Sequence, residues 1–267
     1  MSAIIMDGKK VAAEIEAEIK QAIIEEGLKP KLLIVTDGLD PASKVYIRNK
    51  VKAAERCGIE ADIVEVHSFL TRDIYELYEN YDGIIVQLPM KNDRNAKALI
   101  KLIPYEKDVD GLKDKSRFDP CTPKGIIRLL DYYDLPIAGH HAVVVGRSNL
   151  VGRPLARMLL DRDATVTVCH SKTRDLYIYT QDADYLISAT GVPNLIRDKE
   201  ANGCSVIVDV GINRVDGKIV GDVDYEAVKH IPYFITPVPG GVGPMTVAML
   251  MENTLYAARM RKEDEEC

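Results

Sequence analysis

Two side chains with acid–base chemistry, Tyr46 and Lys50, lie four positions apart in the stretch SKVYIRNK. In a helix, positions i and i+4 are neighbours on one face, so this spacing predicts a phenol beside an amine. Gln87 follows the apolar run GIIV, and Asp110 lies in the loop KDVDG. Each residue alone has an ordinary interpretation, as a solvated lysine, a packed tyrosine, a strand-end amide or a turn aspartate. Together they favour a ligand site at the carboxyl ends of parallel strands.

A glycine turn supplies a second candidate site, in AVVVGRSNLVGRP. An apolar run ends at Gly146, a short turn follows, and a helix-forming stretch begins near Gly152. Backbone N–H groups at such a helix start can bind a nucleotide phosphate. The pattern is not Gly-x-Gly-x-x-Gly, so a tight structural turn explains this motif alone equally well.

The next apolar run indicates which dinucleotide would fit. A site that prefers NAD offers Asp or Glu about 20 residues after the turn, whereas ATVTV here continues into CHSK. Ser171, Lys172 and the nearby Arg147 offer a hydroxyl and two cations, which suit a ribose 2'-phosphate. The sequence therefore predicts NADP, with a solvated loop at Ser171 and Lys172 as the alternative.

The elements that must position these residues form two α/β patterns. Short β-branched runs alternate with helical periods as far as a polar, proline-bounded segment at 104–120, which is typical of a parallel sheet with helices on its faces. We expect a helix after that segment, with Thr122 as its N-cap, and then a second parallel sheet. The expected domains are 1–118, joined by a terminal helix at 245–262, and 119–244.

Composition excludes several classes of protein. The 267 residues are 46% hydrophobic and carry a formal net charge of -6, without a basic run, so a nucleic-acid partner is not expected. The five cysteines form no Cys-x-x-Cys pair, and the histidines have no metal-ligand spacing. No signal peptide or membrane span is visible. We expect a cytoplasmic protein without a metal or a membrane partner.

Longer strings of the sequence resemble one family. The strings KDVDGL, VVVGRSNLVGRP, VIVDVGIN and ITPVPGGVGPMTVAML occur in the order, and nearly in the spelling, of bifunctional methylenetetrahydrofolate dehydrogenase/cyclohydrolases. The resemblance covers almost the whole chain. It implies two α/β domains flanking a cleft, the second a Rossmann-type NADP domain, and a homodimer that acts on tetrahydrofolate substrates in one-carbon metabolism.

The resemblance also assigns residues to roles. It places the catalytic lysine at Lys50, its tyrosine partner at Tyr46, its tuning amide at Gln87 and the pterin-binding aspartate at Asp110. The implied substrate contacts are Ser43, Tyr46, Asp110, Pro239 and Gly240. The implied cofactor contacts are Gly146, Arg147, Ser148, Gly152, Ser171, Lys172, Thr190, Gly191 and Ile212. One departure is the loop QLPMKN, where the family often has a second proline and a nearby histidine.

The implied hydrolysis of a methenyl cation gives Lys50 a task. A lysine with its reference pKa of about 10.4 is a poor base at neutral pH, and lowering such a value to about 7 costs roughly 4 to 5 kcal/mol. Burial can shift a lysine by about 3 to 5 units, and a neutral amide at Gln87 works in the same direction. The sequence leaves open a charged Lys50 that stabilises an oxyanion. It also leaves open a dehydrogenase without hydrolysis and a sensor without turnover.

Overall fold

The computed structural model describes residues 3–37, 41–66, 71–113 and 115–266, and it has the predicted α/β class. The chain divides into two compact units, which we describe separately. The three-stranded unit consists of Ala13–Cys121 and Val247–Cys267, and the six-stranded unit consists of Met1–Ala12 and Thr122–Thr246. The long helices α1 (Gly8–Glu26) and α10 (Val242–Glu266) each begin in the six-stranded unit and continue in the three-stranded unit.

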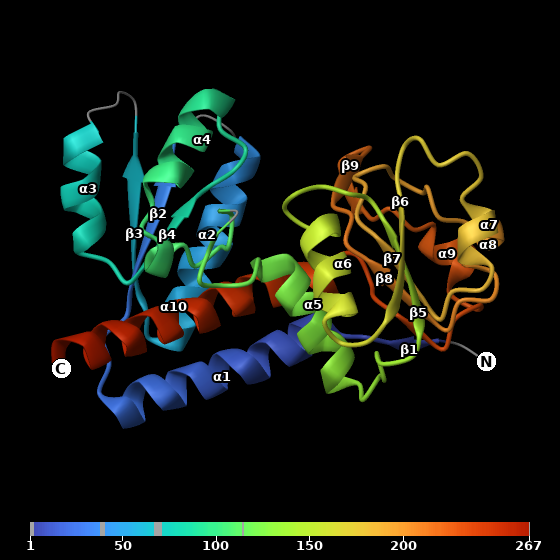
Figure 1. Cartoon of the computed structure of the whole chain (residues 1–267), viewed down its shortest axis with the longest axis horizontal. Helices are drawn as coiled ribbons and strands as arrows, with labels where there is room; N and C mark the ends of the chain where they lie inside the picture. Colours follow the sequence, from blue (N-terminus) through green and yellow to red (C-terminus); the bar gives the residue numbers. More distant parts are fainter. Residues whose placement is uncertain (1–2, 38–40, 67–70, 114, 267) are drawn as a thin grey trace. The chain divides into compact units, whose positions relative to one another are not determined.

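The three-stranded unit is built on a parallel sheet in the order β3-β2-β4 (Figure 1). Its strands are β2 (Lys31–Thr36), β3 (Glu60–Glu65) and β4 (Gly83–Val86). The helices between and after them are α2 (Pro41–Cys57), α3 (Thr71–Glu79) and α4 (Asp93–Leu102), and the short 3-10 helix η1 (Tyr105–Lys107) follows. Parallel strands need such crossover helices.

The core of this unit explains why its strands are apolar throughout. Leu33, Val35, Ile84 and Val86 pack with residues of α3 and α4, including Leu99. Alternate side chains of a strand point to opposite faces, and those on the other face, such as Leu32, Ile34 and Ile85, are equally buried. Both faces of the central strands are therefore covered, which is the usual state of a parallel sheet.

The six-stranded unit contains a parallel sheet in the order β1-β11-β8-β7-β5-β6. The strands are β1 (Ile4–Ile5), β5 (His141–Val145), β6 (Thr165–Cys169), β7 (Tyr185–Ser188), β8 (Val206–Asp209) and β11 (Phe234–Ile235). The helices are α5 (Cys121–Tyr132), α6 (Gly152–Leu160), α7 (Tyr177–Thr180), α8 (Asp198–Ala201) and α9 (Tyr225–Val228). A hairpin of β9 (Asn213–Val215) and β10 (Lys218–Val220) forms a separate ribbon. Numbered along the chain from β5, the five strands from β6 to β11 have the order 2-1-3-4-5, which is an order of doubly wound nucleotide-binding sheets.

Several expectations about elements need correction or addition. Thr122 is not an N-cap, because α5 already begins at Cys121, and its hydroxyl instead lies 3.0 Å from that of Thr246. The sequence pattern predicts neither α1 nor β1. Because β1 pairs with β11, the first residues group with the six-stranded unit, and the expected domain over 1–118 stays a prediction. The charged C-terminal segment continues α10 as far as Glu266.

Candidate active site

Lys50 and Gln87, two of the predicted catalytic residues, are in direct contact. Lys50 lies on α2, and Gln87 directly follows β4, where its backbone N–H donates to Val35 O at 2.8 Å. Lys50 Nζ donates to Gln87 Oε1 at 3.1 Å. Gln87 is buried and Lys50 is half-buried. The contact is therefore at the carboxyl ends of β2 and β4, where open α/β sheets bind ligands.

The hydrogen-bond partners of the Gln87 side chain favour an amide over a carboxylic acid at this position. Its Nε2 donates to Leu88 O at 2.5 Å while its Oε1 accepts from Lys50. An amide has both a donor and an acceptor, whereas an ionised carboxylate only accepts. A glutamate at this position would direct one oxygen at a carbonyl oxygen and the other at the amine. The site is thus built for a neutral partner of Lys50.

The other two predicted residues of α2 are placed differently. Ser43 is almost fully buried, and its Oγ donates to Pro89 O at 3.4 Å, beyond the cis peptide bond between Leu88 and Pro89. Tyr46 lies one turn before Lys50 and is 40% exposed. Ser43 therefore fixes the loop after Gln87 to the helix, and Tyr46 can offer its phenol to a ligand.

Asp110, predicted to bind the pterin, lies in a loop attached to the strand that precedes Gln87. The backbone forms a parallel bridge between Ile84 of β4 and Asp108, so the chain toward Asp110 runs alongside β4. Asp108 is fully buried and accepts from the N–H groups of Leu112 at 3.2 Å and Lys113 at 2.9 Å. Burial raises the pKa of Asp108, against the effect of these hydrogen bonds.

A residue of α10 holds the same loop from its other side. The Nδ2 of Asn253, which is fully buried, donates to Val109 O at 2.9 Å and to Asp119 O at 3.4 Å. Cys121 Sγ also donates to Val109 O at 3.2 Å. Buried carbonyl groups need such partners. Asn253 thus connects both ends of the loop that carries Asp110.

The loop QLPMKN, which departs from the family pattern, is anchored by its backbone. Lys91 N donates to Asp37 Oδ2 at 2.5 Å. Asn92 then caps α4 by accepting from the N–H groups of Arg94 at 3.0 Å and Asn95 at 3.3 Å. Met90 is buried. Residues 38–40, which precede α2 in the sequence, lie outside the described residues.

The predicted phosphate turn is present between β5 and α6, in the six-stranded unit. Gly146 has a φ of 118° and a Cβ at this position would lie 2.3 Å from Ala189 O, so only glycine fits. A Cβ on Gly152 would lie 2.1 Å from Gly146 O. These two close approaches are the roles that the glycines of a dinucleotide-binding turn perform.

Ser148 stabilises the start of α6 from within the turn. Its Oγ accepts from the N–H groups of Val151 at 3.1 Å and Gly152 at 3.4 Å. In the described part of the chain, the N–H groups of 147–150 have no hydrogen-bond partner, and these residues are exposed. Unpaired N–H groups before a helix are a binding site for an anion. The turn thus fits a phosphate.

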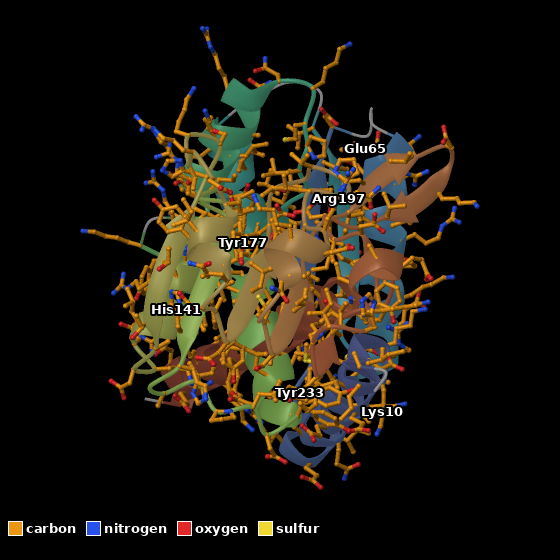
Figure 2. All side chains as sticks on the ribbon, turned by 90° about the vertical axis from the view of Figure 1, so that its right-hand side faces the viewer. Lys10, Glu65, His141, Tyr177, Arg197 and Tyr233 are labelled. Carbon is orange, nitrogen blue, oxygen red and sulfur yellow. The ribbon has the colours of Figure 1, made fainter. Side chains whose placement is uncertain are left out.

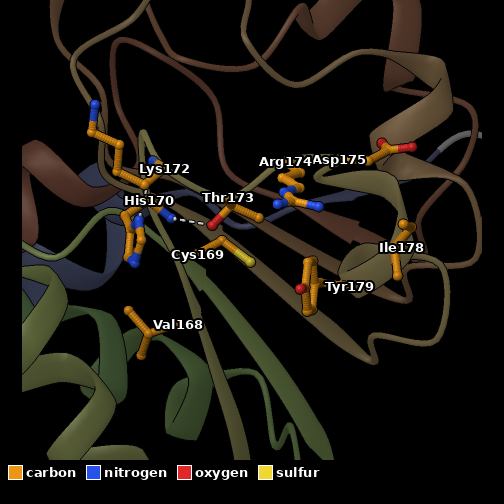
Figure 3. A pocket seen from close by; sticks show the side chains of 9 residues that line it. All are labelled: Val168, Cys169, His170, Lys172, Thr173, Arg174, Asp175, Ile178 and Tyr179. Atoms are coloured by element: carbon orange, nitrogen blue, oxygen red, sulfur yellow. Dashed lines mark hydrogen bonds between the residues drawn. The ribbon is translucent and has the colours of Figure 1, made fainter.

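A pocket of about 440 Å³ lies at the carboxyl end of β6 (Figure 3). His170 and Lys172 lie on one side of it and Ile178 and Tyr179, from α7, on the other. The backbone N–H of His170 donates to Thr173 Oγ1 at 2.9 Å, which closes the loop. The predicted Lys172 thus lines a pocket with cationic and aromatic walls, and the neighbouring Ser171 is exposed.

The same pocket contains two charged residues that sequence reasoning did not single out. Arg174 adds a further cation to the lining. Asp175 also lines it, but its Oδ1 lies 3.4 Å from Lys199 Nζ and accepts from Tyr177 N at 3.2 Å. The carboxylate therefore already has a cation and a helix start as partners, and the other charges of the pocket are positive. An anionic ligand fits them.

Two of the remaining predicted cofactor residues, Thr190 and Gly191, contact a buried carboxylate. Thr190 N donates to Asp222 Oδ2 at 2.7 Å and Gly191 N to the same oxygen at 3.2 Å. Ile212 follows β8 on a neighbouring loop and is 48% exposed. These residues lie beyond the carboxyl ends of β7 and β8. The turn after β5 and the pocket after β6 also lie at the carboxyl ends of their strands.

Pro239 and Gly240 belong to a turn after β11. The peptide bond between Val238 and Pro239 is cis, and Gly240 O accepts from Lys9 N at 3.1 Å. Pro239 is exposed, whereas Gly240 is buried. The structure thus places the predicted residues in two groups, one in each unit. Their roles in binding stay predictions.

The hydrogen bonds of His141 and the burial of Cys57 and Cys204 indicate structural roles for these side chains. The ring of His141, labelled in Figure 2, hydrogen-bonds with Asp182 O at 3.0 Å and Thr167 Oγ1 at 2.9 Å. Burial raises the pKa of the Cys57 and Cys204 thiols to about 12. Among the described residues, no group of three or more His, Cys, Asp or Glu is placed to hold a metal ion, and no helix is long and apolar enough to cross a membrane. His67 and Cys267 lie outside these residues.

Comparison with known proteins agrees with this architecture. The model of the tetrahydrofolate dehydrogenase/cyclohydrolase catalytic domain matches residues 6–110, and that of the family's NAD(P)-binding domain matches 120–262. The chain is 46% identical to the bifunctional protein FolD of Nitrosospira multiformis, over 97% of this chain and 96% of that protein.

Solved structures are similar over the same length. The bifunctional FolD methylenetetrahydrofolate dehydrogenase/cyclohydrolase of Campylobacter jejuni superposes with a TM-score of 0.90 at 41% identity, covering 97% of this chain and 100% of that one. A Trypanosoma brucei FolD, solved with NADP cofactor and an inhibitor, gives a TM-score of 0.88 at 31% identity, over 98% and 99% of the two chains. The resemblance seen in the sequence is confirmed, and the chain belongs to the tetrahydrofolate dehydrogenase/cyclohydrolase family.

Proposed function

We propose that this protein is a bifunctional folate enzyme, which oxidises methylenetetrahydrofolate to methenyltetrahydrofolate with NADP and then hydrolyses the product to formyltetrahydrofolate. The hydrogen bond of 3.1 Å between Lys50 Nζ and Gln87 Oε1 is the observation that carries the proposal. It pairs an amine with a neutral amide at the ligand-binding edge of a sheet, in a chain that belongs to this family. A dehydrogenation alone does not need such a pair.

The cofactor groups fit the six-stranded unit. Bound NADP supplies the hydride acceptor for the first reaction. The N–H groups of 147–150 and the start of α6 would hold its pyrophosphate. Ser171, Lys172 and Arg147 would bind the 2'-phosphate by charge-assisted hydrogen bonds, and Arg174 is placed to add another. The proposed NADP domain is 119–244.

The folate groups are proposed for the domain formed by 1–118 and the helix over 245–262. Asp110 would accept hydrogen bonds from the pterin, and its negative charge would favour the cationic methenyl product. Ser43 and Tyr46 would contact other parts of the substrate. Pro239 and Gly240, the other proposed substrate contacts, belong to 119–244. For the first reaction the task of these residues is mainly to position the donor carbon, because correct orientation supplies much of the rate of such a transfer.

Lys50 performs the acid–base work of the second reaction. As a neutral amine it accepts a proton from the water that attacks the methenyl carbon, while a C–O bond forms. It then returns a proton to the ring nitrogen as the C–N bond breaks, with Tyr46 one turn away to orient the amine. The amide of Gln87 supports this base role over a permanently charged lysine, because an amide adds no charge that would hold the ammonium form.

Absorbance of the purified protein mixed with methylenetetrahydrofolate and NADP, and then with NAD, tests the proposal. NADPH formation with little build-up of the methenyl intermediate is the expected result. Reduced cofactor with accumulating methenyl product would leave only a dehydrogenase, and no reduced cofactor would leave a folate or dinucleotide sensor. Lys50→Met is expected to abolish hydrolysis and to keep NADP binding, which calorimetry measures.

We also propose a homodimer in a reducing, cytoplasmic setting. The family resemblance supports the dimer, and so does the edge strand β3, where Ile63 is 49% exposed. None of the described cysteines forms a disulfide, in line with a reducing compartment. Sedimentation of the protein at micromolar concentration tests the dimer, and a monomer there would contradict it.

A further inference from the structure

Two buried aspartates of the six-stranded unit have no role in the reactions described above. Asp209 is the last residue of β8 and is 4% exposed, and Asp222, after the β9–β10 hairpin, is 0% exposed. A buried carboxylate is unfavourable unless hydrogen bonds offset its loss of water. The partners of these carboxylates therefore show which parts of the chain they hold in place.

Asp222 accepts hydrogen bonds mainly from the turn after β7. Its Oδ2 accepts from Ser188 Oγ at 3.1 Å, Thr190 N at 2.7 Å, Thr190 Oγ1 at 2.9 Å and Gly191 N at 3.2 Å. Its Oδ1 accepts from Asn213 Nδ2 at 3.1 Å. One carboxylate thus connects the turn after β7 with the loop after β8.

Asp209 in turn fixes the position of Asp222. Asp209 Oδ1 accepts from Gly211 N and Asp222 N, both at 2.9 Å, and its Oδ2 accepts from Val223 N at 2.9 Å. Asp222 O accepts from Ile196 N at 3.0 Å. A Cβ on Gly211 would lie 2.1 Å from Asp222 Oδ1. Both the N–H and the carbonyl group of Asp222 are therefore hydrogen-bonded, and its side chain has no room to shift toward Gly211 in the loop after β8.

The turn that Asp222 holds has little freedom of its own. The hydroxyl of Thr190 donates to Asp222 and accepts from Val192 N at 3.1 Å, so its orientation is fixed. The N–H groups of Thr190 and Gly191 are both directed inward, at the carboxylate. Gly191 and Ile212 are both exposed, and they lie at the ligand-binding edge of the sheet.

We propose that Asp222 is a positioning residue for hydride transfer. It holds the turn 188–191 and the loop at Ile212 in the position that the bound dinucleotide requires. This inference rests on the proposed function, because Thr190, Gly191 and Ile212 are cofactor contacts only if NADP binds there. Asp222 acts through these residues and not by contact with the cofactor. Its effect is on orientation, and misplacement by about 1 Å can cost on the order of 100-fold in rate.

The variant that tests this is Asp222→Ala, with three measurements besides overall activity. In the protein without cofactor, hydrogen exchange of a peptide spanning 188–192 is expected to become faster, because two N–H groups lose their acceptor. The single-turnover rate of NADPH formation is expected to fall about 10- to 100-fold, with a larger isotope effect from substrate deuterated at the methylene carbon. The calorimetric dissociation constant of NADP is expected to change much less than the rate.

Hydrolysis of added methenyltetrahydrofolate serves as the internal control, because Lys50 and Gln87 belong to the other unit. Asp224→Ala is the matched variant: it removes a carboxylate two residues away, which caps α9 by accepting from Ala227 N at 3.4 Å. Asp224→Ala is expected to keep wild-type hydride transfer.

Asp222→Asn keeps an acceptor oxygen for the turn. Asn213 can rotate its amide so that its oxygen accepts from the new amide group. This variant is therefore expected to recover most of the rate of hydride transfer.

Wild-type hydride transfer in a folded Asp222→Ala variant would overturn the proposal, as would an equal loss of hydride transfer and hydrolysis, or no recovery in Asp222→Asn. If Asp222→Ala does not fold, Ser188→Ala removes one donor from the same carboxylate, and unchanged exchange and rate in that variant would also overturn it. A wild-type protein that reduces no NADP would instead show that the proposed function is wrong.

Discussion

Exchanging the amide of Gln87 for an acid is a sharp test of how Lys50 works. In Gln87→Glu, a carboxylate replaces the group whose Oε1 lies 3.1 Å from Lys50 Nζ and whose Nε2 lies 2.5 Å from Leu88 O. The side chain keeps its length, so the change is mainly one of charge and of a lost donor. The variant leaves every other predicted catalytic residue in place.

The size of the effect follows from that separation. An opposite charge within about 4 to 6 Å favours the charged form of an ionisable group by roughly 1 to 3 pK units. At 1.36 kcal/mol per unit, such a charge contributes about 1.4 to 4 kcal/mol. Because Lys50 is only half-buried, solvent weakens the interaction and the lower end of that range applies. We expect the hydrolysis rate to fall about tenfold.

The assay follows the decay of methenyltetrahydrofolate absorbance from pH 6 to 9, corrected for the uncatalysed reaction. Gln87→Glu is expected to regain activity only toward high pH. Gln181→Glu, which adds the same charge at an exposed position of the other unit, controls for net charge and is expected to match the wild type. Wild-type hydrolysis by Gln87→Glu at pH 7 would refute Lys50 as a base and favour a lysine that works as a cation.

Three further outcomes are expected. Replacing Lys172 and Arg174 together with alanine is expected to raise the KM for NADP at least about tenfold, since a hydrogen bond to a charged group contributes about 1.5 to 3 kcal/mol, and an equal rise for NAD would contradict this. Burial raises the pKa of Asp209 to about 6 from 3.8; because the folded value is the higher one, its stabilising contribution is complete below about pH 4 and is lost as the pH rises through 6. Chemical unfolding of the wild type and Asp209→Asn at several pH values measures that difference, which a constant offset would contradict. Asn253→Leu is expected to cost about 1 kcal/mol in unfolding free energy, because Val109 O loses its amide donor and keeps only the weak S–H donor of Cys121, and to raise the KM for the folate through the loop of Asp110; an unchanged folate KM would separate this loop from substrate binding.

The sequence determined the parts of this protein that depend on local patterns. The helix expected to begin near Gly152 is α6, which starts at that residue. Gly146 could be recognised from the sequence as the end of a buried strand. The contact between Lys50 and Gln87 could be anticipated as well, since a residue at a strand's carboxyl end and one on a neighbouring helix meet at the same edge of a parallel sheet.

Other features depend on partners that are remote in the sequence. The strand β1 is too short to be recognised by pattern, and it exists because Ile4 and Ile5 pair with β11. Thr122 has the character of an N-cap but lies inside α5, opposite Thr246 of α10. Nothing local to Asn253 indicates that its side chain connects both ends of the loop of Asp110.

The clearest division between sequence and tertiary structure is at the buried carboxylates. The strings VIVDVGIN and GDVDY carry Asp209 and Asp222, and by residue type these aspartates resemble many solvated turn residues. Their role arises only when β7 and β8 pair side by side and the chain after the β9–β10 hairpin brings Asp222 to the turn after β7. The sequence determines which side chains can donate, accept or carry charge. Only the folded chain removes water from Asp222 and brings five hydrogen bonds to it, because burial and hydrogen-bond partners are properties of the whole arrangement.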